Sequence, residues 1–252
     1  MFLDRFHTLQ DGNVQVSALQ ASQFAKEIAG DFNPIHDPDA RRFCVPGDLL
    51  FALVLDRFGL SRRMTFEFRS LVGADVPLNF TERSDGHLTV DNGADKVYLD
   101  VTRDGDVVND PTAIEAFVRC YVAASGKNFP HTLKPLMESE GVMFNPDRPM
   151  IMYESMSLAL DDPDAGAGDA GAVLDAPELV MDSARLDANG KRGNVTLDYH
   201  LHNHGAPVGS VTKRLVVSGL RPYCAEAMAA VVEEFYRLKA RGTRYGAPDA
   251  NG

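Results

Sequence analysis

The sequence predicts an α+β fold made of two similar units whose antiparallel sheets join edge to edge. Two observations support this prediction. In residues 1–110, and again in residues 111–242, helical periodicity comes mainly first and alternating strand patterns follow. The chain of 252 residues also has the length for two small units that share a core. Joining the two sheets would remove one exposed edge from each of them.

The first unit is predicted to open with a short strand at 14–16 and a helix over 21–29 that ends at Gly30. Pro46 suits the first position of a second helix, because it has no N–H to lose there. Residues 49–58 of that helix are apolar nearly all round, so it should be mostly buried. Strands are then expected at 64–68, 76–80 and 97–101, with hairpin signals at 91–93 and 104–105.

The second unit repeats the order of helix and then strands. Pro111 can begin a helix with an apolar stripe that includes Phe117 and Tyr121. A further helical piece is expected over 133–140. Strands should follow at 150–160, 178–186, 194–202 and 208–217, with turns at 189–190 and 203–205.

The remaining segments are a final helix, a loop and a tail. Pro222 is expected to open the helix, which runs to about Arg241. Its apolar stripe consists of Ala225, Met228, Val232, Phe235 and Leu238. Residues 161–174 are rich in Asp, Ala and Gly and are predicted to form a long mobile hairpin loop, and residues 243–252 a disordered tail.

The composition excludes several classes of function. The net charge of −11 argues against a general nucleic-acid binder, although paired arginines at 41–42 and 62–63 could hold phosphates or form solvated helix ends. The longest apolar run is too short to span a membrane, and the first residues lack the pattern of a signal peptide. Cys44, Cys120 and Cys224 are too widely spaced for a disulfide framework or a zinc pair, which favours a reducing, cytoplasmic location.

The most informative segment is Asp31-Phe32-Asn33-Pro34-Ile35-His36. Pro34 cannot lie inside a helix, and it pushes Asn33 out of the α region. The chain should therefore turn sharply here after a helix end, which can direct Asp31 and His36 at the same small volume. A carboxylate and an imidazole that converge in this way make an acid/base pair for a water molecule.

Two later segments add to this motif. Residues 45–50 carry a Pro-Gly step before an apolar helix, and residues 64–76 form an alternating strand that ends in Gly-Ala-Asp. With the motif at 31–36, they resemble the MaoC-like dehydratases, the (R)-specific enoyl-CoA hydratases of the hot-dog fold. The resemblance covers residues 15–105. Residues 111–242 resemble a second hot dog only in their order of elements, and they lack the catalytic motif.

The resemblance implies a double hot-dog fold, in which two antiparallel sheets wrap around a central helix each and join into one continuous sheet. It also implies hydration of 2-enoyl thioesters, or dehydration of 3-hydroxyacyl thioesters, carried by CoA or an acyl-carrier protein. No cofactor or metal is needed for this reaction. Neither a nucleic acid nor a membrane is an expected partner, and exposed sheet edges make a homodimer plausible.

Roles for single residues follow from the resemblance. His36 would act as the base on a water, Asp31 would assist in returning the proton, and Asn33 would hold the turn or hydrogen-bond the carboxylate. The N–H of Gly47, at the positive end of the buried helix, would face the thioester oxygen. The acyl chain would lie against apolar walls that include Phe51 and Leu55.

Two departures from the family pattern leave other interpretations open. The family usually has His where this chain has Pro46, and Asp48 adds negative charge near the expected oxyanion site. A catalytically silent module that binds or senses acyl thioesters is therefore a second interpretation. A thioesterase is a third, because such sites usually carry an acid on the central helix, where this chain has Asp48 and Asp56.

A further cluster of titratable residues lies near the end of the chain. His200, His202 and His204 alternate along a predicted strand and could share one face. Three imidazoles on one face can bind Zn²⁺, but a polar face in contact with solvent is the simpler interpretation.

Overall fold

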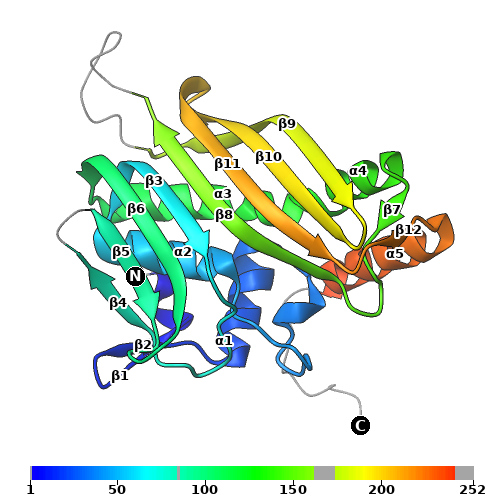
Figure 1. Ribbon diagram of the computed structural model, residues 1–252. Coiled ribbons are helices and arrows are strands. Elements are labelled where there is room, and N and C mark those ends of the chain that lie inside the picture. The colour runs from blue at the N-terminus through cyan, green and yellow to red at the C-terminus, as the bar shows by residue number, and fades with distance from the viewer. Residues whose placement is uncertain (1, 84–85, 162–173, 242–252) are drawn as a thin grey trace.

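The computed structural model describes residues 2–83, 86–161 and 174–241, and its centre is one antiparallel sheet of eight strands (Figure 1). The strand order is β4-β5-β6-β3-β8-β11-β10-β9. The first half contributes β3 (Leu60–Phe68), β4 (Asn79–Glu82), β5 (His87–Asp91) and β6 (Val97–Val108). The second half contributes β8 (Met150–Leu160), β9 (Pro177–Asn189), β10 (Arg192–Asn203) and β11 (Ala206–Ser218).

The two halves of the sheet join where β3 pairs with β8. The register of this pairing runs from Arg63 opposite Ala159 to Glu67 opposite Ser155. Because β3 also pairs with β6, and β8 with β11, both strands are central and the edges of the sheet are β4 and β9. The prediction that the two sheets join edge to edge is confirmed.

Two helices cover the same face of this sheet, α2 (Gly47–Phe58) and α3 (Pro111–His131) (Figure 1). Helix α2 follows Pro46, and every residue from Asp48 to Leu55 is buried, in agreement with its apolar sequence. Helix α3 starts at Asp110, whose side chain accepts a hydrogen bond from the N–H of Ala113 and so satisfies one of the free donors of the first turn.

The two helices share one hydrophobic core. The rings of Phe51 on α2 and Tyr121 on α3 stack with their centroids 4.1 Å apart, and Phe66 from β3 packs against Phe51 at 4.8 Å. A continuous antiparallel sheet packed around two central helices is the α+β double hot-dog fold that the sequence predicts.

The N-terminal segment packs against this core and leads into the turn with the motif. Its elements are η1 (Phe2–Arg5), β1 (Thr8–Gln10), β2 (Asn13–Gln15), α1 (Ala18–Gln23) and the π-helical turn η2 (Phe24–Ala29). Ser17 and Gln20 form a reciprocal capping box at the start of α1, which fixes where the helix begins. The helix predicted over 21–29 is therefore present but begins three residues earlier, at Ala18, and changes to π geometry before Gly30.

The C-terminal part of the chain closes over the end of the second half. It contains α4 (Leu133–Ser139), the two-stranded pair β7 (Val142–Met143) and β12 (Arg221–Pro222), and α5 (Ala225–Arg241). In α5, Met228 and Phe235 are the buried members of the predicted apolar stripe. None of the helices in the described part of the chain is long and apolar enough to cross a membrane.

Three sequence predictions are wrong in detail. Asp104-Gly105 is not a hairpin but lies inside β6, where a bulge opposite β3 absorbs the extra residues and Gly105 takes a φ of 81°. The strand expected at 76–80 begins only at Asn79. Pro222 does not open the last helix, because its strand β12 pairs with β7 and α5 begins at Ala225.

Two other predictions, the loop at 161–174 and the tail at 243–252, lie almost wholly outside the described residues.

Candidate functional site

The turn after η2 brings the predicted acid/base pair together. Gly30 takes the left-handed conformation with a φ of 66°, and the N–H of Asp31 donates to the carbonyl of Ala25 at 2.8 Å. The chain then forms the 3-10 turn η3 (Pro34–His36). As a result, Oδ2 of the Asp31 carboxylate lies 3.6 Å from Nε2 of His36.

Asn33 holds this turn with its backbone and with its side chain. Its N–H donates to Oδ1 of Asp31 at 2.8 Å, and its own side-chain oxygen accepts from the N–H of Ile35 at 3.2 Å. Both bonds span two residues, which is the geometry by which Asx side chains stabilise turns. Since Oδ1 of Asp31 is engaged in this way, Oδ2 is the oxygen that faces His36.

The other ring nitrogen of His36 determines what Nε2 can do. Nδ1 lies 2.8 Å from the carbonyl oxygen of Cys44, and a carbonyl only accepts, so Nδ1 carries the proton. In the neutral imidazole, Nε2 then keeps its lone pair and can act as a base. Burial, with a smaller contribution from Asp31, raises the pKa of the neighbouring Cys44 thiol to about 12. Cys44 therefore stays protonated at neutral pH and does not compete for this role.

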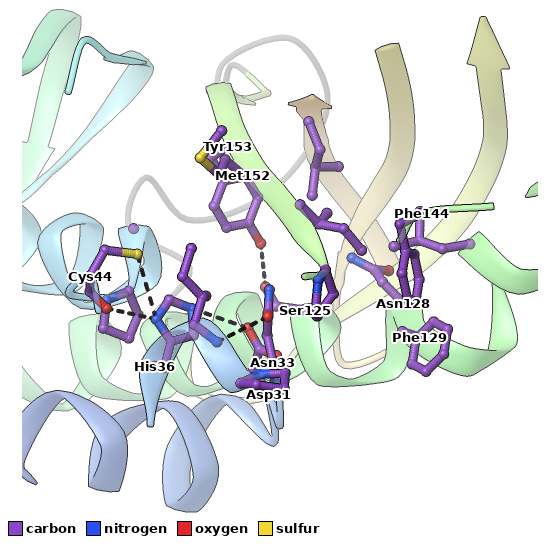
Figure 2. Close-up of a pocket in the computed structure, with 18 of the residues that line it drawn as sticks. Asp31, Asn33, His36, Cys44, Ser125, Asn128, Phe129, Phe144, Met152 and Tyr153 are labelled. Atoms are coloured by element: carbon purple, nitrogen blue, oxygen red, sulfur yellow. Dashed lines mark hydrogen bonds and ion pairs between the residues drawn. The ribbon is translucent and has the colours of Figure 1, made fainter. Parts of the chain in front are cut away.

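A cavity of about 860 Å³ adjoins this pair (Figure 2). Asp31 and His36 line it together with the first turn of α2, the second half of α3, and parts of β8, β11 and α5. Its apolar wall includes Phe129, Phe144 and Phe235, with ring centroids of Phe129 5.8 Å from Phe144 and 5.5 Å from Phe235. A cavity of this size and lining suits a small organic ligand with a long apolar part.

Gly47 lines the cavity at the N-terminus of α2, where the first N–H groups of a helix have no partner within the helix. A Cβ at this position would lie 3.0 Å from the ring of Phe68 and 3.1 Å from the ring of Tyr153. Glycine therefore lets two aromatic side chains approach the helix start closely. Because Gly47 is the first residue of α2 and lines the cavity, the positive end of the helix dipole lies at the cavity.

Phe51 and Leu55 do not line this cavity, which corrects the predicted walls of the acyl pocket. Both side chains are fully buried, and Phe51 lies between Phe66 and Tyr121 in the core shared by the two central helices. They point away from the cavity because they face the core between α2, α3 and the sheet. The side of the helix that faces the cavity is its first turn, with Gly47 and Leu50.

A second group of polar residues lies in the same region, and the sequence prediction missed most of it. Lys213 on β11 is completely buried, and its Nζ donates to the carbonyl of Tyr121 at 2.8 Å and to Oγ of Ser125 at 3.2 Å. Oγ of Ser125 also lies 2.5 Å from the hydroxyl of Tyr153. Asp48, which is 2 % exposed, is the fourth polar side chain buried in this region. We call Asp48, Ser125, Tyr153 and Lys213 the buried polar cluster.

Burial governs the electrostatics of this cluster. Desolvation raises the pKa of Asp48, and the charge of Lys213 and the polar side chain of Ser125 oppose that shift. Desolvation lowers the pKa of Lys213 to about 8, against the attraction of Asp48. In each group the attraction of the other opposes the larger effect of desolvation, so it offsets only part of the cost of burial. Oδ1 of Asp48 has no hydrogen-bond partner among the described residues.

One sequence signal could have pointed to this cluster. Along β11 the buried residues alternate as Val211, Lys213, Leu215 and Val217, so the strand period of two places a lysine on the apolar face. No comparable signal marks Ser125, which lies in the middle of a long helix.

The other polar groups singled out in the sequence lie elsewhere. Nε2 of His200 lies 3.4 Å from Asp182 and Nε2 of His204 lies 2.7 Å from Asp175. Among the described residues, no group of three or more His, Cys, Asp or Glu side chains could hold a metal ion. The arginine pairs 41–42 and 62–63 do not line the cavity.

Residues 1–226 match the model of a protein family described as "Protein of unknown function (DUF3581)". No curated protein matches the chain significantly. Among solved structures, a conserved protein with a hot dog fold from Alicyclobacillus acidocaldarius is 12% identical, with 88% of this chain and 98% of that chain covered and a TM-score of 0.44. The acyl-CoA thioesterase II TesB2 from Mycobacterium marinum is 9% identical, with 89% and 99% covered and a TM-score of 0.43. A bifunctional dehydratase-cyclase domain of ambruticin biosynthesis is 10% identical, with 75% and 86% covered and a TM-score of 0.34.

Proposed function

The chain belongs to the DUF3581 family, and we propose that its cavity hydrates 2-enoyl thioesters, or dehydrates 3-hydroxyacyl thioesters, carried by CoA or an acyl-carrier protein. The observation that carries this proposal is the pairing of Asp31 with the free Nε2 of His36 beside a large, mostly apolar cavity. The likeness of the turn to the MaoC-like hydratase motif supports the same reaction.

The distance between the two groups favours a shared water. At 3.6 Å, Oδ2 of Asp31 and Nε2 of His36 are too far apart for a good direct hydrogen bond. A water that bonds to both would be polarised by the base and oriented by the carboxylate. In hydration, the water oxygen bonds to C3 of the enoyl group and its proton passes to Nε2. A proton then returns to C2 with the help of Asp31, so that one water is added in total.

The negative charge that develops on the thioester oxygen needs stabilisation. The N–H groups at the start of α2, beginning at Gly47, have no partner within the helix and lie at the cavity, so they can donate hydrogen bonds to this oxygen. The positive charge of Lys213 opposes the negative charge of the buried Asp48 carboxylate near this site. The acyl chain would lie along the wall that includes Phe129, Phe144 and Phe235 in place of the Phe51 and Leu55 wall predicted from the sequence.

The test is turnover of crotonyl-CoA and longer 2-enoyl-CoAs by the purified protein, followed as loss of the enoyl-thioester absorbance. We expect His36→Ala and Asp31→Asn each to slow turnover by about 10²–10⁴-fold, the usual contribution of general acid–base groups. We expect the double variant to be little slower than the worse single variant, because the two residues act as a unit. His200→Ala is the matched control, since that imidazole lies outside the cavity.

Three other results would point elsewhere. Binding of enoyl-CoA without turnover, by a folded protein, would support a silent acyl-thioester module. Release of free thiol instead of loss of the double bond would support a thioesterase. Equal turnover in the wild type and in His36→Ala would contradict the proposed roles.

A further inference from the structure

Asn128 is a buried amide on the wall of the cavity, and the hydration described above does not use it. Tyr121, Ser125 and Asn128 recur at helical spacing and so lie on one face of α3. Tyr121 belongs to the core, whereas Ser125 and Asn128 line the cavity. The face of α3 that packs in the core therefore carries polar side chains where it reaches the cavity.

One side of the Asn128 amide is held by Tyr199 on β10. The Tyr199 hydroxyl donates to Oδ1 of Asn128 at 2.8 Å, and both residues are 4% exposed. A phenol has one proton to donate, and an amide oxygen only accepts. The opposite orientation of the amide would place N–H groups against the hydroxyl and would leave the Tyr199 proton without this acceptor. Oδ1 therefore faces Tyr199, and the NH₂ group lies on the other side of the amide.

This NH₂ group has two protons to donate. None of the residues that the structure describes accepts a hydrogen bond from Nδ2 of Asn128. Nδ2 is also not among the unpartnered atoms that are fully enclosed, so it keeps some accessible surface, and Asn128 lines the cavity. A donor buried in protein costs free energy unless a water or a ligand accepts its hydrogen bond. The wall of the cavity therefore offers a hydrogen-bond donor at this point.

The surroundings of Asn128 indicate which part of a ligand would meet this donor. Figure 2 shows Asn128 beside Phe129 and Phe144, which belong to the apolar wall of the cavity. Glu154 and Arg192 also line the cavity, but their side chains are exposed and so lie at its mouth. The polar carrier of a thioester would remain at the mouth. The acyl chain would extend along the apolar wall and pass Asn128.

We propose that Asn128 is a specificity residue, which selects acyl thioesters with a carbonyl oxygen along the acyl chain by donating a hydrogen bond from Nδ2 to that oxygen. The thioester class rests on the proposed function, and the oxoacyl chain is what Asn128 adds to it. A carbonyl suits this donor because it has lone pairs and no proton of its own. A carboxylate suits it less, because the carboxylates of Asp31 and Glu234 line the same cavity and would repel a further anion.

The test compares the binding of octanoyl-CoA with that of 5-oxo-, 6-oxo- and 7-oxooctanoyl-CoA to the full chain, by isothermal titration calorimetry. These thioesters have no double bond between C2 and C3, so they cannot be hydrated and binding alone is measured. We expect the best oxoacyl ligand to bind the wild type about ten-fold more tightly than octanoyl-CoA, the effect of one hydrogen bond. We expect Asn128→Leu to lose this preference and to bind octanoyl-CoA at least as tightly as the wild type.

Two further variants separate recognition of the oxygen from effects on folding. Asn128→Leu leaves the Tyr199 hydroxyl without its acceptor. The double variant Asn128→Leu/Tyr199→Phe removes both partners of that hydrogen bond, which costs less stability than removing one, and it should lose the preference in the same way. Asn194→Leu replaces an exposed asparagine of β10 that does not line the cavity, and it should keep the full preference.

The outcomes distinguish this inference from the proposed function. Equal binding of octanoyl and oxoacyl ligands by the wild type, or an unchanged preference in both Asn128 variants, would overturn the role of Asn128. Hydration would still be judged from the turnover of enoyl-CoA. Equal weakening of all four ligands by Asn128→Leu would place the donor against the carrier and would also overturn the proposal. Absence of binding by all four ligands would contradict the thioester class on which both proposals rest.

Discussion

The two halves of this double hot dog supply polar groups to one cavity in different ways. In the first half, Asp31, Asn33 and His36 come from one short turn, and each is held by hydrogen bonds to near neighbours in the chain. In the second half, Ser125, Tyr153 and Lys213 come from α3, β8 and β11. The comparison teaches that a site built from one turn can be recognised from sequence, whereas a site built across elements is assembled by packing.

The polar residues of the two halves also differ in how far they are buried. The side chains of Asp31 and His36 are 29% and 9% exposed, so water can reach the carboxylate. Lys213 is 0% and Asp48 2% exposed, and the attraction between their charges opposes the desolvation of both groups. Variants in the second half should therefore change stability more than variants in the first half.

The largest expected effect on stability is the pH dependence that Lys213 gives to the free energy of unfolding. Its pKa in the folded protein, about 8, lies below its ordinary value of 10.5. Between these values the unfolded chain binds more protons than the folded one, so the free energy of unfolding rises with pH. From pH 7 to pH 10 we expect a rise of about 2.5 kcal/mol from this group, because one pKa unit corresponds to about 1.4 kcal/mol and the titration is incomplete at both ends of this range.

Urea unfolding of the wild type and of Lys213→Met, at several pH values, measures this contribution as the difference between the two curves. The other titrating groups cancel in that difference. They include Tyr121 and Tyr153, whose pKa values are raised by burial and which oppose the trend above pH 10. Parallel curves for the two proteins would show that Lys213 titrates normally.

A smaller effect on stability is expected where α3 of the second half meets the end of η2 of the first half. Gly126 on α3 meets the end of η2, and a Cβ there would lie 2.3 Å from the carbonyl oxygen of Ala29 and 2.4 Å from that of Gly30. Gly126→Ala must push the backbone before Asp31 away, so we expect a loss of about 2 kcal/mol in the free energy of unfolding and slower hydration.

Gly73→Ala is the control for this contact. A Cβ at Gly73 meets nothing closer than Val76 at 3.7 Å, and the position needs no special backbone conformation. Equal effects of the two substitutions would mean that the close approach of α3 to the turn has no influence on the site.

The smallest effect is expected for Asn33. Asn33→Ala removes one side-chain hydrogen bond, to the N–H of Ile35, and should cost about 1 kcal/mol of stability. Asn145→Ala removes the same kind of bond, to the N–H of Asp147 at 3.0 Å, in the second half. We expect similar stability losses but slower hydration only for Asn33→Ala. Slower hydration by both variants would show that the effect is not specific to the turn.

Much of the fold could be predicted because it depends on local patterns. The apolar α2, the caps and glycines at helix ends, and the alternating strands were recognised within a few residues of their bounds. The errors arose where a long-range contact overrode a local signal. Asp104-Gly105 became a bulge because β3 continues past it, and Pro222 entered a strand because β7 offers it a partner.

The sequence by itself determined the turn from Asp31 to His36, because Gly30, Asn33 and Pro34 restrict the backbone over a few bonds and leave it little freedom. Only the tertiary structure decided which apolar residues face the cavity and which lie in the core, as Phe51 and Leu55 illustrate. It also brought Ser125 and Lys213 within 3.2 Å across 88 positions of the chain. The physical reason is that a helix or strand pattern fixes which face a residue occupies, while the partner of that face depends on the register and packing of distant segments.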